Sequence, residues 1–224
     1  WNGISGSDNN KANQVYISSG NLFFRAGYSS AFTTTAGVSI NANTWTHVTA
    51  TDDGTTLKVY LNGSEITAWA TNTTITQNTN YGINIAQEHD IGRRSQGASL
   101  GYFDGYQAEI NFIDGQQLTP SSFGANNSAT GVWQPIKYSG TYGTNGFYLP
   151  FTDNSALTSG SNAGLGKDFS GNGNYWNTNN ISVTSGSTYD AMLDSPTPKS
   201  ATVGNFAVLN PLARTSSSMT IQDG

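Results

Sequence analysis

The sequence contains no cysteine and few charged residues. The first absence excludes a disulfide-stabilised protein, and the second argues against a nucleic-acid-binding one. Without cysteine a disulfide scaffold is excluded, so stability has to come from core burial, strand pairing, bound ions or oligomerisation. Only 10% of the 224 residues are charged, with 9 basic against 14 acidic side chains and a net charge of −5. Because Arg93-Arg94 is the only basic pair, the chain lacks the positive patch that binds nucleic acid.

Helix-forming residues and long apolar runs are also scarce. Ala, Leu, Glu and Lys are thinly spread, and no apolar run approaches the ~20 residues of a membrane-spanning helix. In their place stand 26 glycines, many Asn, Ser and Thr residues, and 12% aromatics. This composition is typical of short strands joined by tight turns, and its aromatic content excludes a disordered chain. We predict an all-β protein with no membrane insertion.

Alternating apolar residues predict two hairpins. Residues 14–18 and 22–26 flank a short turn that contains Gly20. The strongest pattern joins residues 45–51 to residues 56–61 through an Asp-Gly turn and continues into the turn Asn62-Gly63. In the second strand of this hairpin, alternation places Leu57, Val59 and Leu61 on one face.

A longer strand is predicted from residue 103 to the turn Asp114-Gly115, and a single helical turn at residues 118–124. The strand would present an unpaired edge, which a strand at residues 147–151 could cover, although Pro150 favours an edge or a bulge. Further strands are predicted at residues 38–40, 81–86, 206–212 and 219–221.

An ordered set of motifs over residues 14–124 resembles laminin-G and pentraxin-type domains. The set consists of Thr44-Trp45-Thr46-His47-Val48, Asp53-Gly54, Val59-Tyr60-Leu61-Asn62-Gly63, Ile91-Gly92, Phe103-Asp104-Gly105-Tyr106 and Leu118-Thr119-Pro120. The chain departs from the family pattern at Gln107-Ala108-Glu109-Ile110, where the family often has I-D-E-V. The resemblance implies a concanavalin A-like jelly-roll β-sandwich with Trp45 in its core.

The same resemblance implies a domain division. Residues 1–124 are expected to form the sandwich, with its first strands missing before Trp1. Residues 125–146 are expected to be a connector, whose Trp133, Tyr138 and Tyr142 clamp it to a neighbouring domain or subunit. Residues 147–224 either start a second β unit or complete the first sandwich. The first alternative follows because residues 147–176, with Asp168-x-Ser170-Gly171-Asn172-Gly173-Asn174, resemble the opening of another such domain.

A second resemblance is to large virion proteins of marine tailed phages, usually described as virion structural or tail-fibre proteins. It rests on the runs at residues 112–116, 131–135, 140–147 and 205–212. The resemblance implies a place on the particle exterior, in a tail fibre or on the capsid surface. It also implies other virion subunits as partners and a homo-oligomer, with a trimer favoured for a fibre.

Catalytic groups are not arranged for hydrolysis. Concanavalin A-like glycoside hydrolases need two carboxylates, about 5–5.5 Å apart in retaining enzymes. The nearest candidates are Glu109 and Asp114, but Asn111 stands where a carboxylate is needed and strand alternation separates the two acids. His47 is expected to be a structural strand residue and His89 part of a solvated turn. We expect no enzymatic activity.

Two kinds of binding site remain open. Exposed aromatic rings near turns could stack on sugars, and the candidates are Tyr28, Trp69, Tyr81, Tyr102 and Tyr106. Calcium is the one cofactor that the family suggests, and Asp53, Asp90 and Asp104 are candidate ligands. For the two Asp-Gly aspartates, Asp53 and Asp104, turn formation is a sufficient explanation and is favoured over metal binding.

Three functions follow from these expectations. The first is a tail-fibre or spike segment that recognises a host-surface glycan. The alternative is a purely structural virion protein, such as a capsid decoration or a component of a fibre shaft. A polysaccharide depolymerase is disfavoured because a carboxylate pair is missing. Clustering of the exposed aromatics at one rim would favour glycan binding, and their burial against partner chains would favour assembly.

Overall fold

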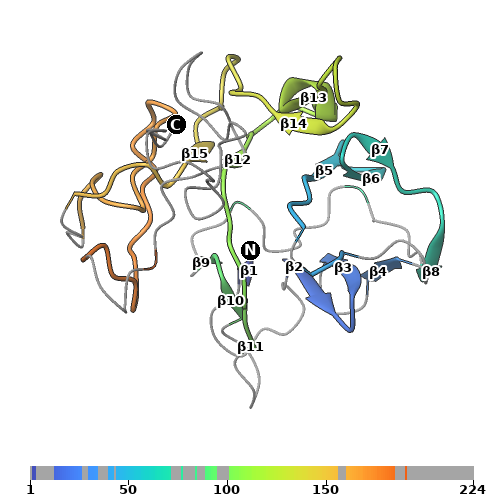
Figure 1. Cartoon of the computed structure of the whole chain (residues 1–224), viewed down its shortest axis with the longest axis horizontal. Helices are drawn as coiled ribbons and strands as arrows, with labels where there is room; N and C mark the ends of the chain where they lie inside the picture. The colour runs from blue at the N-terminus through green and yellow to red at the C-terminus, as the bar shows by residue number, and fades with distance from the viewer. Residues whose placement is uncertain are drawn as a thin grey trace, which may run out of the picture. The chain divides into compact units, whose positions relative to one another are not determined.

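The fold of the chain is that of a computed structural model (Figure 1). It describes residues 2–3, 13–26, 30–34, 40–42, 44–71, 77, 84, 89–94, 101–155, 160–184 and 190. All regular elements in these ranges are β-strands except one short 3-10 helix, which confirms the predicted all-β class. None of the helical structure in the described ranges is long and apolar enough to cross a membrane.

The chain divides into two compact units. Unit 1 comprises Trp1–Tyr106 and Gly115–Trp133, and unit 2 comprises Gln107–Asp114 and Gln134–Gly224. The predicted connector, residues 125–146, is therefore shared between the two units.

The larger sheet of unit 1 is antiparallel and has the strand order β8-β4-β3-β2-β1-β9. Its strands are β1 (Asn2–Gly3), β2 (Asn13–Ser18), β3 (Asn21–Ala26), β4 (Ser30–Thr34), β8 (Trp69–Thr71) and β9 (His89–Asp90). Strands β2 and β3 form the predicted hairpin, with Ser19 and Gly20 in left-handed conformations at the turn. The outer faces of this hairpin carry a stacked pair, Tyr16 and Phe23, with ring centroids 4.7 Å apart.

The second sheet of unit 1 contains the other predicted hairpin. Strands β5 (Val48–Asp52), β6 (Leu57–Leu61) and β7 (Ser64–Glu65) pair in that order. Asn62 and Gly63 have φ values of 48° and 80°, so both adopt the left-handed conformation that a tight hairpin turn between twisted strands requires. The predicted Asn-Gly turn is confirmed.

The hydrophobic core of unit 1 joins these two sheets. Leu22 from β3, Val59 from β6 and Ile66, which follows β7, form its buried cluster. Partly buried side chains from both sheets pack against this cluster, namely Val15, Phe24, Ile40, Leu57, Leu61 and Trp69. Face-to-face packing of two antiparallel sheets is the architecture of a β-sandwich, and the predicted shared face of Leu57, Val59 and Leu61 is confirmed.

The prediction of a core position for Trp45 is wrong. Trp45 is 43% exposed, and it precedes the first residue of β5, so strand alternation does not direct its side chain inward. Within β5 the buried positions are Thr49 and Thr51, whereas Val48 is exposed.

The prediction of one long strand over residues 103–113 is wrong for most of its length. Only β12 (Ile110–Phe112) is a strand, because Glu109 has a φ of 55° and breaks the extended backbone before it. The other short elements are β10 (Arg93–Arg94), β11 (Gly101–Tyr102), the 3-10 helix η2 (Pro120–Ser122), β13 (Gly124–Asn126) and β14 (Trp133–Pro135). Helix η2 is the predicted helical turn.

Unit 2 contains the strand pair β12–β15. Strand β15 (Phe147–Leu149) lies antiparallel to β12, with Phe112 opposite Phe147 and their rings 5.5 Å apart. All three residues of β15 are buried. The edge of β12 is therefore covered by the strand predicted at residues 147–151, although both strands belong to unit 2. The strands predicted at residues 206–212 and 219–221, and most of those at 38–40 and 81–86, lie outside the described residues.

Candidate functional site

The two most exposed aromatic side chains in the described part of the chain, Tyr102 and Tyr106, lie with Phe103 in one short segment, Gly101–Tyr106, called here the aromatic segment. Tyr102 is 70% exposed, Tyr106 65% and Phe103 42%. Every residue of the segment is exposed. Large apolar rings held in water are the groups that stack on the apolar faces of sugar rings.

The start of the aromatic segment is held by a hairpin. Strand β11 pairs with β10, which places Tyr102 opposite Arg93, and the backbone N–H of Phe103 donates a hydrogen bond of 2.8 Å to the carbonyl of Gly92. A Cβ on Gly105 would lie 3.0 Å from the Phe103 ring, so the glycine allows that ring to lie against the backbone. The rings therefore project from an anchored turn.

Asp104, between the two tyrosines, has a carboxylate that makes no hydrogen bond or ion pair within the described part of the chain. Each other acidic residue described accepts a hydrogen bond: Asp52, Asp53, Glu65, Asp90, Glu109, Asp114, Asp153, Asp168 and Asp190. The hydroxyls of Tyr102 and Tyr106 likewise have no partner among the described residues. The aromatic segment thus combines exposed rings with three polar groups available to a ligand.

An ion pair lies next to the segment. Nε of Arg93 donates a 2.8 Å hydrogen bond to Oδ1 of Asp90, whose side chain is 12% exposed. The other carboxylate oxygen of Asp90 is buried and has no hydrogen-bond partner in the described structure. Arg93 lies on the hairpin that carries Tyr102, and the carboxylate of Asp90 holds its side chain in place.

The five predicted sugar-binding residues have different positions. Tyr102 and Tyr106 are both exposed in the aromatic segment, whereas Trp69 packs against the core of unit 1. Tyr28 and Tyr81 lie outside the described residues. Phe103 was not among the predicted residues, although it stands beside Tyr102 in the same exposed run.

The three predicted calcium ligands are not brought together. Asp53 lies in the turn between β5 and β6, Asp90 ends β9, and Asp104 follows β11. Hydrogen bonds from Thr55, side chain and backbone, and from the backbone of Thr56 lower the pKa of Asp53. The described residues contain no group of three or more His, Cys, Asp or Glu side chains that could hold a metal ion.

The two candidate catalytic carboxylates each accept hydrogen bonds within unit 2. Glu109 accepts a short hydrogen bond from the hydroxyl of Tyr148, and Asp114 accepts hydrogen bonds from the backbone and side-chain nitrogens of Asn145 at 3.1 and 3.2 Å. Burial raises the pKa of Tyr148, and the bond to Glu109 raises it further. Burial also raises the pKa of Tyr142 to about 12. The Tyr148–Glu109 bond is partly buried, whereas the Asn145–Asp114 bonds are exposed.

The most extensively bonded carboxylate of unit 2 belongs to Asp168, which is 3% exposed. Its oxygens accept hydrogen bonds from the backbone N–H groups of Tyr148, Ser170 and Asn174 at 2.8–2.9 Å, and from the Ser170 hydroxyl at 2.8 Å. Burial alone would raise the pKa of Asp168, but these hydrogen bonds outweigh it and the pKa is lowered. Because protein donors occupy both oxygens, Asp168 organises the loop around it.

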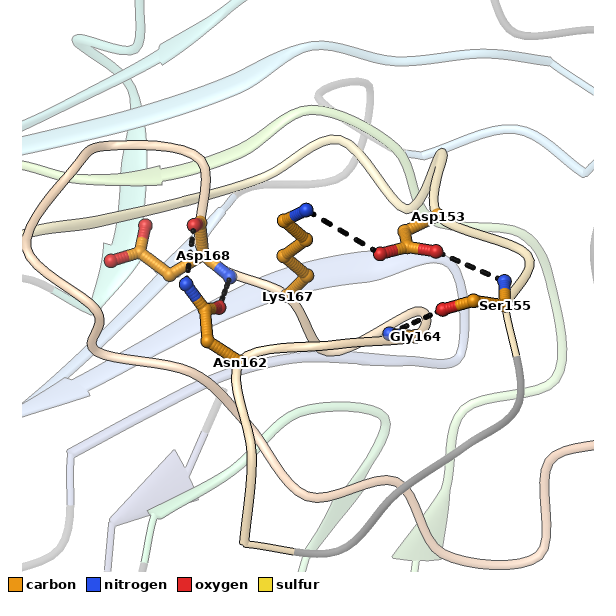
Figure 2. Close-up of polar contacts among 6 residues, drawn as sticks. All are labelled: Asp153, Ser155, Asn162, Gly164, Lys167 and Asp168. Carbon is orange, nitrogen blue, oxygen red and sulfur yellow. Dashed lines mark hydrogen bonds and ion pairs between the residues drawn. The ribbon is translucent and has the colours of Figure 1, made fainter.

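Figure 2 shows how the preceding loop is tied to Asp168. The side chain of Asn162 accepts a hydrogen bond of 2.7 Å from the backbone N–H of Asp168 and donates one of 3.3 Å to its carbonyl. Next to Asp168 in the sequence, Lys167 has its Nζ 3.7 Å from Oδ2 of Asp153, whose carboxylate also accepts a hydrogen bond from the Ser155 N–H. These contacts fold the described part of the loop onto itself.

The histidines and connector aromatics are structural as well. His47 lies beside Trp133, with ring centroids 5.7 Å apart, and burial lowers its pKa. Tyr138 and Tyr142 are buried in unit 2 with their rings edge to face. The prediction that His89 lies in a solvated turn is wrong, because it is a half-buried residue of β9 paired with Gly3.

Comparison with known proteins adds one finding. Residues 2–122, more than half of the chain, match the family described as the concanavalin A-like lectin/glucanases superfamily, in its laminin-G form. No curated protein and no solved structure matches the chain significantly.

Proposed function

The chain belongs to the concanavalin A-like lectin/glucanase superfamily, and on this premise we propose that it recognises a glycan through the aromatic segment Gly101–Tyr106. The observation that carries the proposal is the exposure of Tyr102 and Tyr106, 70% and 65%, on either side of an available carboxylate. Aromatic rings supply stacking surfaces for sugars, and the hydroxyls and the carboxylate supply hydrogen bonds.

The biological setting that we propose is the exterior of a tailed-phage particle. The resemblance of several runs to phage virion proteins supports it, and a segment of a tail fibre or spike would then meet the glycans of a host surface. In this setting the partners are other virion subunits, and the protein is a binding module without catalytic activity.

Alanine substitution of each tyrosine tests the proposal. The wild-type chain should retain members of a glycan array, and Tyr102→Ala and Tyr106→Ala should each weaken binding about tenfold, as loss of a central aromatic contact does. Calorimetric titration of the retained glycan measures the change. Tyr175→Ala is the matched control, because Tyr175 is 38% exposed but lies in unit 2. If the wild type retains no glycan, or if the three variants bind alike, the proposal is wrong.

A structural role in the particle is the second candidate. Val132 is 58% exposed within the phage-like run at residues 131–135, and an exposed aliphatic side chain beside Trp133 suits a subunit contact. Cryo-electron microscopy of intact particles separates the candidates. Many copies with Tyr102, Tyr106 and Val132 buried between subunits would favour the structural role, whereas few copies with the aromatic segment facing solvent would favour recognition.

A further inference from the structure

We infer that the aromatic segment discriminates glycans by charge, binding amine-bearing sugars more tightly than neutral ones and carboxylated sugars more weakly. The inference rests on the proposed glycan-binding function and names the class of sugar that this same site takes. Its basis is the position and the availability of one carboxylate, that of Asp104.

Asp104 lies two residues from Tyr102 and two residues from Tyr106, so a sugar stacked on either ring is close to its carboxylate. The side chain is exposed and accepts no hydrogen bond from the described part of the chain. A ligand can therefore bond to it without displacing a protein donor. An ionised carboxylate accepts charge-assisted hydrogen bonds from hydroxyl groups, and stronger ones from an ammonium group.

The positive charge opposite Tyr102 is already engaged. Arg93, across from Tyr102, has Nε bonded to Oδ1 of Asp90 at 2.8 Å. The pair offsets its own charge, and within the aromatic segment itself Asp104 is the one charged residue. The net charge of the whole chain, −5, acts in the same direction on an approaching acidic sugar.

The size of the effect follows from the exposure of the group. Contacts between exposed ionic groups are weak because water screens them, and they change affinity by up to about fivefold. We expect an amine-bearing oligosaccharide to bind about threefold to fivefold more tightly than its neutral counterpart, and a carboxylated one to bind correspondingly more weakly. Added salt should shrink both differences, because it screens exposed charges.

Three tetrasaccharides with the same β-1,4-linked glucose backbone supply the test. They are cellotetraose, its 2-amino counterpart glucosamine tetraose, and its C6-oxidised counterpart, the cellouronic acid tetraose. Calorimetric titration of the full chain in a mildly acidic buffer of low salt keeps the amines protonated. Asp104→Asn removes the charge while keeping the shape, and Glu65→Gln removes one exposed charge outside the segment as the matched control.

The inference predicts the affinity order amine, neutral, carboxylated for the wild type and for Glu65→Gln, and near-equal affinities for Asp104→Asn. Equal binding of the three sugars by the wild type would overturn the charge inference and leave the proposed function standing. Tightest binding of the carboxylated sugar would overturn it too, and would assign recognition to Arg93 and Arg94. Failure of all three sugars to bind would overturn the inference. Whether the protein binds any glycan, as the proposed function requires, is then decided separately by the glycan array.

Discussion

Gly63 leaves no space for a side chain. A Cβ at this position would overlap carbons of the Trp133 ring, and one at Gly124 would lie 2.5–2.6 Å from the same ring. Trp133 therefore lies directly over two glycines, from segments far apart in the sequence. Its ring also neighbours His47.

This contact predicts a large loss of stability for Gly63→Ala. The new methyl group would push against an aromatic ring in a left-handed backbone, and overpacking of this kind costs about 1–3 kcal/mol in addition to ~1 kcal/mol of backbone strain. Urea unfolding followed by tryptophan fluorescence measures the loss. Gly54→Ala is the matched control, since Gly54 has a similar φ of 84° but no atom within 4 Å of the new Cβ.

A double substitution isolates the ring contact. In a Trp133→Leu background the extra cost of Gly63→Ala over Gly54→Ala should largely disappear, because the two effects share one contact. An unchanged difference would show that the turn backbone, and not Trp133, causes the loss.

At this scale the sequence predicted part of the site. Turn residues around Tyr102 and Tyr106 indicated their exposure correctly, because a glycine precedes each tyrosine and Asp104 lies between them. The availability of Asp104 could not be predicted, since it depends on which donors the folded chain brings near. The core position expected for Trp45 was wrong, because the strand begins three residues later.

Among the elements, the loop around Asp168 carries the clearest prediction. Its carboxylate accepts four hydrogen bonds and is 3% exposed. Asp168→Asn replaces one acceptor oxygen by a donor NH₂ group facing other donors, and an unmet buried hydrogen bond costs about 1–3 kcal/mol. We expect unit 2 to lose this much stability at neutral pH, measured by urea unfolding. Trp176, whose ring lies 5.1 Å from that of Phe147, reports on the unit.

The same carboxylate makes the stability of the folded chain depend on pH. The pKa of Asp168 is lower in the folded chain than the ordinary value of about 3.9 that applies when it is unfolded. Its stabilisation is therefore present above that ordinary value and is lost as the pH falls through the folded pKa. Asp168→Asn should lack this loss. Asp104→Asn, which removes an unbonded carboxylate, should unfold like the wild type, and equal effects of the two variants would contradict the assignment.

Elements set by local signals were predicted, and those set by distant contacts were not. The hairpin β5–β6 and the turn Asn62-Gly63 depend on alternation and turn residues that stand next to each other. The interruption before β12 depends on Glu109, whose carboxylate bonds to Tyr148 from a strand 39 positions away. A local sequence pattern cannot predict a hydrogen bond between residues so far apart in the chain.

For the whole molecule, the match of residues 2–122 to one family does not coincide with the division into units. Residues 107–114 fall within the match but belong to unit 2, where β12 pairs with β15. Unit 1 in turn continues to Trp133, beyond the end of the match. Sequence motifs mark where a family pattern ends, whereas long-range packing decides where a folding unit ends.

The position of Trp133 predicts how the chain tolerates truncation. A fragment of residues 1–124, which ends near the family match, lacks the ring that covers Gly63 and Gly124. A fragment of residues 1–136 keeps that ring together with β13 and β14. Loss of a large, partly buried aromatic side chain costs about 3 kcal/mol, so the longer fragment should have the higher free energy of unfolding in urea.

Two substitutions in the longer fragment separate the stabilising effect of Trp133 from the effect of fragment length. Both fragments lack β15, so β12 is unpaired in each and does not contribute to the difference. Trp133→Ala in the longer fragment should lower its stability to that of the shorter one, while Val132→Ala, at a position 58% exposed, should change it by less than about 0.5 kcal/mol. If the two fragments are equally stable, the ring over Gly63 does not stabilise the sandwich and the family match alone defines the folding unit.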